Sequence, residues 1–459
     1  MSRRQRRKPP LTQTPLPAAG DARPSGHRLL LAALALLYVV FAVGHLAVTP
    51  VLSSGSFINA PDEPAHLAYV RLVAEERRLP TRADSKTTYE WHQPPFYYVL
   101  AAPLWPTGPH AVRSLGVACG LVGILLVWAA TRWLAPADPD AATLAAGLVA
   151  LLPMRHAITA AAGNDGLTEA LFTLTLAIVI RVVVAGPSSA RSAALGAALG
   201  AALLAKATSL LLVPIAFAAI LLARRRGVPW RTVAGHLATC GACVVLIAGW
   251  WYARNAALYG APLPSAAFAE EFAGTQQAAD WLDKPLRVDA VTGDLAPSTE
   301  PMGRTGYSLL IANWTWRTLI GAYTPPAGAV MGVPRFLPPG FYLPHLLLGV
   351  CALVGLARLA RSSQAGAHAV DRGAASLMVA AALLVLAAFG AFTWRYFQAQ
   401  GRYLYPAILP LSSFTAMGLR AIVPEARRNV FSASVLGVMV LLSVVFLFGA
   451  VVPAYLSSP

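Results

Sequence analysis

Apolar runs of about 20 residues recur along the chain, and they constrain its fold more than any other feature of the sequence. Each run is close to the length that an α-helix needs to cross the hydrocarbon core of a membrane. Only 12% of the residues are charged, against about a quarter in a typical soluble domain. The runs lie at 29–49, 111–134, 141–160, 166–184, 190–205, 207–223, 232–251, 341–360, 374–394, 403–422 and 430–451. The sequence therefore predicts an all-α integral membrane protein with about eleven transmembrane helices.

A basic tail and two long connections interrupt this pattern. The opening stretch MSRRQRRKPPLTQTPLPAAGDARPSG is rich in proline and has no apolar periodicity, so residues 1–28 are expected to form a disordered cytoplasmic tail. Residues 29–459 are expected to form one polytopic membrane domain. Within it, the connections 50–92 and 253–340 are long enough to carry helices at the membrane surface.

The distribution of basic residues predicts the orientation of the spans. The net charge is +16, and Lys and Arg gather at the ends of the apolar runs, where such residues set topology. With the N-terminus in the cytoplasm, almost the whole net charge falls inside, and both long connections face outward. We therefore expect a protein of the cell (inner) membrane whose partner is the lipid bilayer, and we do not expect it to bind nucleic acid.

The stretch INAPDEPAHLAYVRLV, residues 58–73, places two adjacent acids just outside the first apolar run. Pro64 suits the first turn of a helix, and apolar side chains recur every third residue from Leu67, which predicts a short amphipathic helix on the membrane surface. Two interpretations of Asp62 and Glu63 follow. The acids could cap this helix, or they could act on a substrate at the depth of the lipid headgroups.

Further polar side chains fall near the outer ends of later runs. They are His66, Glu90, His92, Gln93, Asp165, Arg155, Lys206, Arg254, Arg395 and Arg402. Any one of the five cations is explained by a long side chain that reaches for the membrane surface. Five outer cations run against the positive-inside tendency, however, and together they favour a site for an anion such as a lipid phosphate. The remaining five are candidate substrate-binding residues.

Carboxylate and imidazole groups in these segments also supply enough oxygen and nitrogen ligands for a divalent metal. No spacing demands a metal, because Asp62 and His66 form only a one-turn pair without a clear third ligand. A divalent metal is therefore possible, but the sequence assigns no metal and no other cofactor.

Five stretches occur in the order PDEPAH, HQPPFYYVLAAPLW, LLAKATSLLLVP, WWYARNAALYGAPL and QGRYLYPAILP. They resemble the GT-C membrane glycosyltransferases, especially the bacterial relatives of protein mannosyltransferases and aminoarabinose transferases, and still more closely a related bacterial family of multi-pass proteins. The resemblance covers roughly residues 30 to 425. It implies the GT-C fold, a sugar donor carried on polyprenyl phosphate and an inverting transfer.

The resemblance also implies roles for particular residues. An acidic residue of the first outer loop acts as the base, a role that carries over to Asp62 with Glu63 beside it. Phosphate binding carries over to three cations, Lys206, Arg254 and Arg402.

The residue types suit this chemistry independently of the resemblance. Sugar transfer needs a base for the acceptor hydroxyl and cations for the departing phosphate. The sequence therefore favours an inverting glycosyltransferase that moves a sugar from a polyprenyl-phosphate donor to a glycan, lipid or protein acceptor at the outer face. A transporter or lipid flippase would need charged residues deep in several spans, and these spans are mostly Ala, Leu and Val. A non-catalytic membrane assembly protein is the other alternative, and for it the outer polar residues would be incidental.

Overall fold

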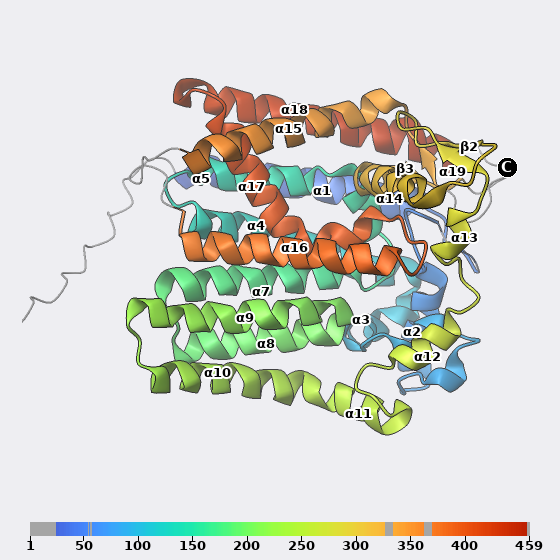
Figure 1. Ribbon diagram of the computed structural model, residues 1–459, viewed down its shortest axis with the longest axis horizontal. Coiled ribbons are helices and arrows are strands. Elements are labelled where there is room, and N and C mark those ends of the chain that lie inside the picture. The colour runs from blue at the N-terminus through green and yellow to red at the C-terminus, as the bar shows by residue number, and fades with distance from the viewer. Residues whose placement is uncertain (1–23, 54, 56, 326–333, 362–369, 457–459) are drawn as a thin grey trace, which may run out of the picture.

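Long helices packed side by side form one bundle in the computed structural model (Figure 1). The structure describes residues 24–53, 55, 57–325, 334–361 and 370–456 of the 459-residue chain. Most of the predicted tail, residues 1–23, lies outside the described residues, and the first helix begins at Pro24.

All eleven predicted apolar runs are helical. Their helices are α1 (Pro24–Val48), α4 (Pro109–Leu134), α5 (Pro139–Ala150), α6 (Pro153–Thr159), α7 (Asp165–Ala185), α8 (Ser189–Ala205), α9 (Leu212–Leu221), α10 (Trp230–Val244), α11 (Trp250–Tyr259), α15 (Pro339–Arg361), α16 (Arg372–Thr393), α17 (Ile408–Ala421), α18 (Arg428–Phe446) and α19 (Val452–Leu456). In the described chain, 8 helical stretches are long and apolar enough to cross a membrane, and α5 with α6, bent by 63°, makes up to 9. The all-α membrane fold is confirmed. Eleven crossings remain a prediction, because α8 and α17 are shorter helices of 17 and 14 residues.

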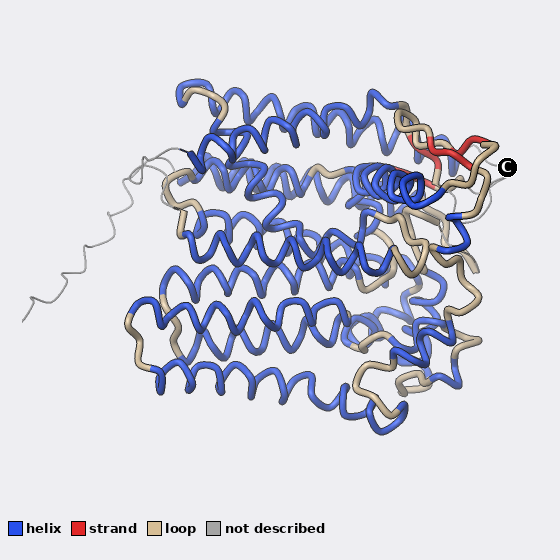
Figure 2. The backbone as a smooth tube through the Cα atoms, in the orientation of Figure 1, coloured by secondary structure: helices blue, strands red, loops and turns tan. Residues whose placement is uncertain are grey.

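The two long connections, together with the segment that follows the first of them, carry the remaining helices and the strands. These are α2 (Glu63–Glu75), α3 (Phe96–Ala101), α12 (Ser265–Glu271), α13 (Ala279–Leu282), α14 (Gly303–Ile320), β1 (Leu286–Val288), β2 (Leu295–Pro297), β3 (Ala322–Tyr323) and β4 (Arg335–Phe336). Strand β1 pairs antiparallel with β2, and β3 pairs antiparallel with β4. Figures 1 and 2 show these elements together at one end of the bundle, which we call the loop end. Both long connections therefore lie on the same side of the helices.

Small residues let the helices of the bundle approach closely. A Cβ atom on Gly355 of α15 would lie 1.8 Å from the carbonyl oxygen of Gly418 in α17. Likewise, a Cβ atom on Gly116 of α4 would lie 2.4 Å from the carbonyl oxygen of Thr159, the last residue of α6. Contacts of this kind, made through small side chains, are how helices associate in a membrane, where apolar side chains gain little from leaving lipid.

Candidate active site

A cavity of about 490 Å³ lies at the loop end, between the two long connections and the helices beneath them. Its walls differ in character. An apolar wall is formed by Val385, Ala388, Phe389 and Phe392 of α16, and Leu211 is a further apolar lining residue. Polar side chains from several separate parts of the chain line the rest. A cavity of this kind suits a molecule with a polar head and an apolar chain.

Four charged side chains, which we call the charge cluster, meet at the polar wall. They are Asp62, Asp165, Lys206 and Arg402. One guanidinium nitrogen of Arg402 lies 2.5 Å from Oδ2 of Asp62, and another lies 2.9 Å from Oδ2 of Asp165. Lys206 Nζ lies 2.5 Å from the other oxygen of Asp165. Two cations and two carboxylates thus compensate one another beside the cavity.

The local backbone explains how Asp62 reaches this cluster. Asp62 immediately precedes α2 and has a left-handed backbone conformation, with φ at 61°. Aspartate tolerates this region better than most residues. Its carboxylate makes no capping bond to the helix. Instead, Oδ2 faces Arg402, and Oδ1 accepts a hydrogen bond from the Tyr89 hydroxyl at 2.9 Å. The capping interpretation of Asp62 is therefore wrong.

Breaks in helical structure place the other members of the charge cluster. Lys206 has an extended backbone between α8 and a 3₁₀ helix, η4 (Ala207–Leu211), so that its side chain leaves the helix axis. Asp165 is the first residue of α7, where a negative charge is favoured by the helix dipole. Arg402 lies in the 3₁₀ helix η7 (Gly401–Ala407) that leads into α17.

Burial and neighbouring charge set the ionisation of the loop residues. Burial alone would raise the pKa of Asp62, but the charge of Arg402 outweighs it and holds that pKa below its usual value. Burial raises the pKa of Glu90 and lowers the pKa of His66. At neutral pH, Asp62 is therefore an anion, and the His66 imidazole is uncharged. Its Nδ1 atom lies 2.8 Å from the Tyr98 hydroxyl.

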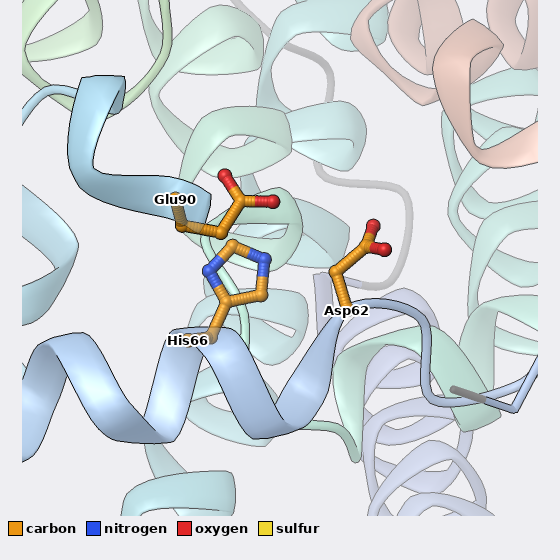
Figure 3. A group of neighbouring side chains, drawn as sticks. All are labelled: Asp62, His66 and Glu90. Atoms are coloured by element: carbon orange, nitrogen blue, oxygen red, sulfur yellow. The ribbon is translucent and has the colours of Figure 1, made fainter. Parts of the chain in front are cut away.

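Three side chains could hold a metal ion. One oxygen of Asp62, one of Glu90 and one imidazole nitrogen of His66 all lie within 4.8 Å of one another. Figure 3 shows them pointing into the same space, two from the start of α2 and one from the 3₁₀ helix η2 (Tyr89–His92). Among the residues that the structure describes, Oε2 of Glu90 is buried without a hydrogen-bond partner, and two oxygens with one nitrogen suit a divalent cation. Glu90 would be the third ligand of such an ion, and sequence spacing could not reveal it because it comes from a different element.

Other predicted site residues also line the cavity. The ring of His92 lies 4.9 Å from that of Phe268 in α12, and burial lowers the pKa of His92 to about 4. Gln93 accepts a hydrogen bond from Asn164 at 3.1 Å. Sequence reasoning missed Phe268, and it also missed Tyr89, which lies one position before the predicted Glu90. Phe268 of α12 and Phe272, which follows the helix, both line the cavity.

Three predicted phosphate-binding cations do not line the cavity, and other partners explain why. Arg155 is fully buried and pairs with Glu169 at 2.6 Å. Arg254 donates to the carbonyl oxygen of Pro80 at 2.8 Å and lies over the Trp251 ring. Arg395 lies over its neighbour Tyr396. The expectation that all five cations converge is therefore wrong for the described structure, which brings together Lys206 and Arg402.

Glu63 also points away from the cavity. It is 2% exposed, and its carboxylate accepts hydrogen bonds from Arg113 at 2.5 and 2.7 Å and from the backbone N–H of Ala162 at 2.7 Å. Successive residues at the start of a helix point in different directions, so Asp62 and Glu63 diverge. The structure gives Glu63 a place in the protein interior and leaves Asp62 at the cavity.

Comparisons with known proteins identify the fold. Residues 94–252 match the family model described as dolichyl-phosphate-mannose-protein mannosyltransferase. The oligosaccharyltransferase of Archaeoglobus fulgidus superposes with a TM-score of 0.55 at 14% identity, over 94% of this chain and 57% of that protein. ArnT of Cupriavidus metallidurans, bound to undecaprenyl phosphate, superposes with a TM-score of 0.53 at 16% identity, over 94% of this chain and 74% of ArnT. The chain has the GT-C fold. Curated protein sequences gave no match.

The GT-C fold, which the resemblance of the five ordered stretches implied, is confirmed. The two superpositions each include 94% of this chain. The chain spans little more than half the length of the archaeal enzyme. Together with the apolar helices, the GT-C fold makes this a multi-pass membrane protein.

Proposed function

We propose that the protein is an inverting glycosyltransferase that moves a sugar from a polyprenyl-phosphate donor to an acceptor at the outer face of the cell membrane. One observation carries the proposal. In a GT-C fold, the carboxylate of Asp62 and the cations Lys206 and Arg402 together line a cavity with an apolar wall. Base, anion site and lipid-compatible surface thus occur together.

The donor fits this cavity by its charge and its apolar chain. Its phosphate group would bind Lys206 and Arg402, the two cations that line the cavity. Its polyprenyl chain would run along the wall that Phe389 and Phe392 of α16 form. Structures of similar proteins support such a donor, since ArnT is seen with undecaprenyl phosphate and an archaeal oligosaccharyltransferase with dolichol phosphate.

The reaction then needs one proton transfer and one displacement. Asp62 accepts the proton of the acceptor hydroxyl, and the freed oxygen forms a bond to the anomeric carbon of the sugar. The bond from that carbon to the phosphate oxygen breaks, and the phosphate leaves with the electron pair. Lys206 and Arg402 stabilise that negative charge, which fixed cations can do in a site shielded from water. In an inverting displacement, base and leaving group lie on opposite sides of the sugar.

Phosphate binding also changes the partners of Arg402. In the described structure, its guanidinium group is shared between Asp62 and Asp165. A phosphate at Arg402 competes with both carboxylates, and loss of the Arg402 contact raises the pKa of Asp62 toward its usual value. The base therefore becomes stronger when the donor is bound. If a divalent cation binds Asp62, His66 and Glu90, it would act as a Lewis acid toward the phosphate.

The two cavity cations provide the test of the donor site. Lys206→Ala and Arg402→Ala should each reduce kcat/KM for an undecaprenyl-phosphate sugar by more than tenfold, because each removes a charge-assisted contact to the phosphate. Arg402→Lys should also lose activity if the phosphate is held by two parallel hydrogen bonds. Purified variants in detergent can be assayed with a panel of undecaprenyl-phosphate sugars, with melting temperature as a check on folding.

Arg254→Ala is the matched control, because Arg254 is a neighbouring cation that does not line the cavity. It should keep the donor kinetics of the parent within about twofold. If the folded Lys206 and Arg402 variants behave like Arg254→Ala, these cations do not hold the donor phosphate, and the proposed site is wrong.

Orientation in the membrane is the second part of the proposal. In a variant without its native cysteines, a cysteine introduced at Ser85 or Thr292 should react with an impermeant reagent in intact spheroplasts. Both positions lie in the long connections at the loop end, which charge distribution places outside. Ser189→Cys, at the opposite end of the bundle, should react only after lysis. The reverse pattern would move the site to the cytoplasmic face.

A further inference from the structure

A second cavity, of about 890 Å³, lies on the opposite face of α2 from the charge cluster. Pro64, Leu67, Ala68 and Arg71 line it, whereas His66 lines the first cavity. Helical residues advance by about 100° per position, so the first four share one side of α2 and His66 points the other way. Helix α2 is thus the partition between two cavities.

Tyr89 is common to both cavities. Its hydroxyl donates to Oδ1 of Asp62 at 2.9 Å, while the other carboxylate oxygen of Asp62 faces Arg402. A hydroxyl group that reaches Asp62 past Tyr89 would take the place of the Tyr89 hydroxyl at Oδ1. It would also approach from the side away from the cations. Through Tyr89, the lining of the second cavity is therefore in contact with the proposed base.

The charge of the second cavity differs from that of the first. Arg71 and Lys86 line it, and no carboxylate occurs among its described lining residues. Within the part of the chain that the structure describes, neither cation forms an ion pair, in contrast to Lys206 and Arg402. Two uncompensated cations in one cavity attract an anion, and a phosphate group can accept hydrogen bonds from both.

Apolar side chains lie beside these cations. The lining includes Val51 and Leu52, just beyond the end of α1, and Leu67 of α2. Trp105 is a further member, and its indole N–H donates to Glu75 at 2.7 Å. Tryptophan is typical of the boundary between membrane and water. Cations next to apolar residues at the end of a membrane helix suit a lipid headgroup better than a soluble polymer.

We propose that the second cavity receives the acceptor, and that this acceptor is a lipid whose headgroup carries a phosphate close to the hydroxyl that receives the sugar. The proposal rests on the transfer reaction proposed above. The headgroup phosphate binds Arg71 and Lys86, and the hydroxyl reaches Oδ1 of Asp62 beside Tyr89. The hydroxyl proton passes to Asp62 as its oxygen bonds to the sugar, and the donor phosphate departs on the far side.

Binding measurements test this assignment without requiring transfer. The full chain in nanodiscs of phosphatidylcholine is titrated with dioctanoyl phosphatidic acid, dioctanoylglycerol, inorganic phosphate and undecaprenyl phosphate. Phosphatidic acid should bind at least tenfold more weakly to the Arg71→Gln/Lys86→Gln variant than to the parent protein. Binding of undecaprenyl phosphate should stay within twofold, because it belongs to the first cavity.

Two variants serve as controls. Arg71→Lys/Lys86→Arg keeps both charges and should keep phosphatidic acid binding within about threefold, while Arg224→Gln/Arg225→Gln removes two exposed charges at the other end of the bundle and should leave it unchanged. The proposal is overturned if the double glutamine variant binds phosphatidic acid like the parent, if dioctanoylglycerol binds equally well, or if an acidic peptide binds and phosphatidic acid does not. Equal affinity for inorganic phosphate would overturn the lipid part.

A transfer assay separates failure of this proposal from failure of the proposed function. With phosphate-bearing lipids as acceptors, the double glutamine variant should show at least a tenfold higher KM for the acceptor and an unchanged KM for the donor. Absence of any sugar transfer by the parent, with phosphatidic acid still bound at Arg71 and Lys86, would reject the transferase and keep the anionic lipid site. Sugar transfer by the double glutamine variant with an unchanged KM for the acceptor would reject the acceptor site and keep the transferase.

Discussion

Asp62→Asn should lower the turnover of sugar transfer by about 10²-fold or more, the range expected for loss of a general base. The amide has nearly the size of the carboxylate and can hydrogen-bond to both Tyr89 and Arg402, but it cannot accept the proton of the acceptor. Donor binding and melting temperature should change little. Turnover, binding of undecaprenyl phosphate and melting temperature should be measured on the same purified samples.

The backbone makes asparagine the informative substitution. Asp62 has φ at 61°, a conformation that asparagine also tolerates and that alanine disfavours, so Asp62→Ala would mix strain with loss of the base. A purely structural role for the carboxylate predicts nearly normal turnover in Asp62→Asn. That outcome would remove Asp62 as the base and direct attention to Glu90, whose carboxylate lies beside His66.

The pH profile distinguishes the two carboxylates. The pKa of Asp62 is held below its usual value, so in the free enzyme Asp62 remains ionised as pH falls to the ordinary carboxylate range, and kcat/KM falls only below that range. Burial raises the pKa of Glu90, so a reaction that used Glu90 as base would lose kcat/KM at a higher pH. In the parent protein, kcat/KM should therefore begin to fall only at a pH below the ordinary carboxylate range.

The membrane fold could be predicted from the sequence because hydropathy over about 20 residues is a local property. Every predicted apolar run is helical. The number of crossings could not be settled in the same way. The run at 141–160 contains Pro153 and bends by 63°, and α8 is short, so the crossing of the membrane depends on how neighbouring helices cover these segments.

The types of residue in the candidate site could be predicted from the sequence, but which charged side chains contact each other could not. Asp62, Lys206 and Arg402 stood out because charges are rare in this chain and these three fall at helix ends. Which partners they meet depends on packing between elements as far apart as positions 62 and 402. Arg155, like Arg402, is an arginine near the outer end of an apolar run, yet it is fully buried and pairs with Glu169. Sequence position alone cannot separate a buried structural pair from a cavity pair.

Removal of the Arg113 guanidinium should have the largest effect on stability. Arg113→Ala should lower the free energy of unfolding by about 3–5 kcal/mol, because it leaves Glu63 as an uncompensated buried charge. Arg113 is 0% exposed and Glu63 2% exposed. The same guanidinium also donates to the carbonyl oxygens of Thr49 at 2.6 Å and Pro50 at 3.1 Å, which ties the end of α1 to the start of α2. Chemical denaturation in detergent, followed by fluorescence, measures the loss.

Two comparisons separate the charge effect from lost packing. The double variant Glu63→Gln/Arg113→Met removes both charges at similar volume and should be more stable than Arg113→Ala, since no isolated charge remains buried. Arg132→Ala removes an exposed arginine from the other end of α4 and should cost well under about 1 kcal/mol. If Arg113→Ala proves as stable as Arg132→Ala, Glu63 is not held as an anion by Arg113.

The double variant Glu63→Gln/Arg113→Met also tests whether the buried pair of Glu63 and Arg113 positions Asp62, the proposed base. Glu63 directly follows Asp62, and its carboxylate is fixed both to Arg113 of α4 and to the backbone of Ala162. These bonds hold the residue after Asp62 while Asp62 keeps its left-handed backbone. If stability recovers in Glu63→Gln/Arg113→Met and turnover stays at least tenfold low with donor KM unchanged, the pair orients Asp62. Recovery of turnover together with stability would limit the pair to holding α1, α2 and α4 together.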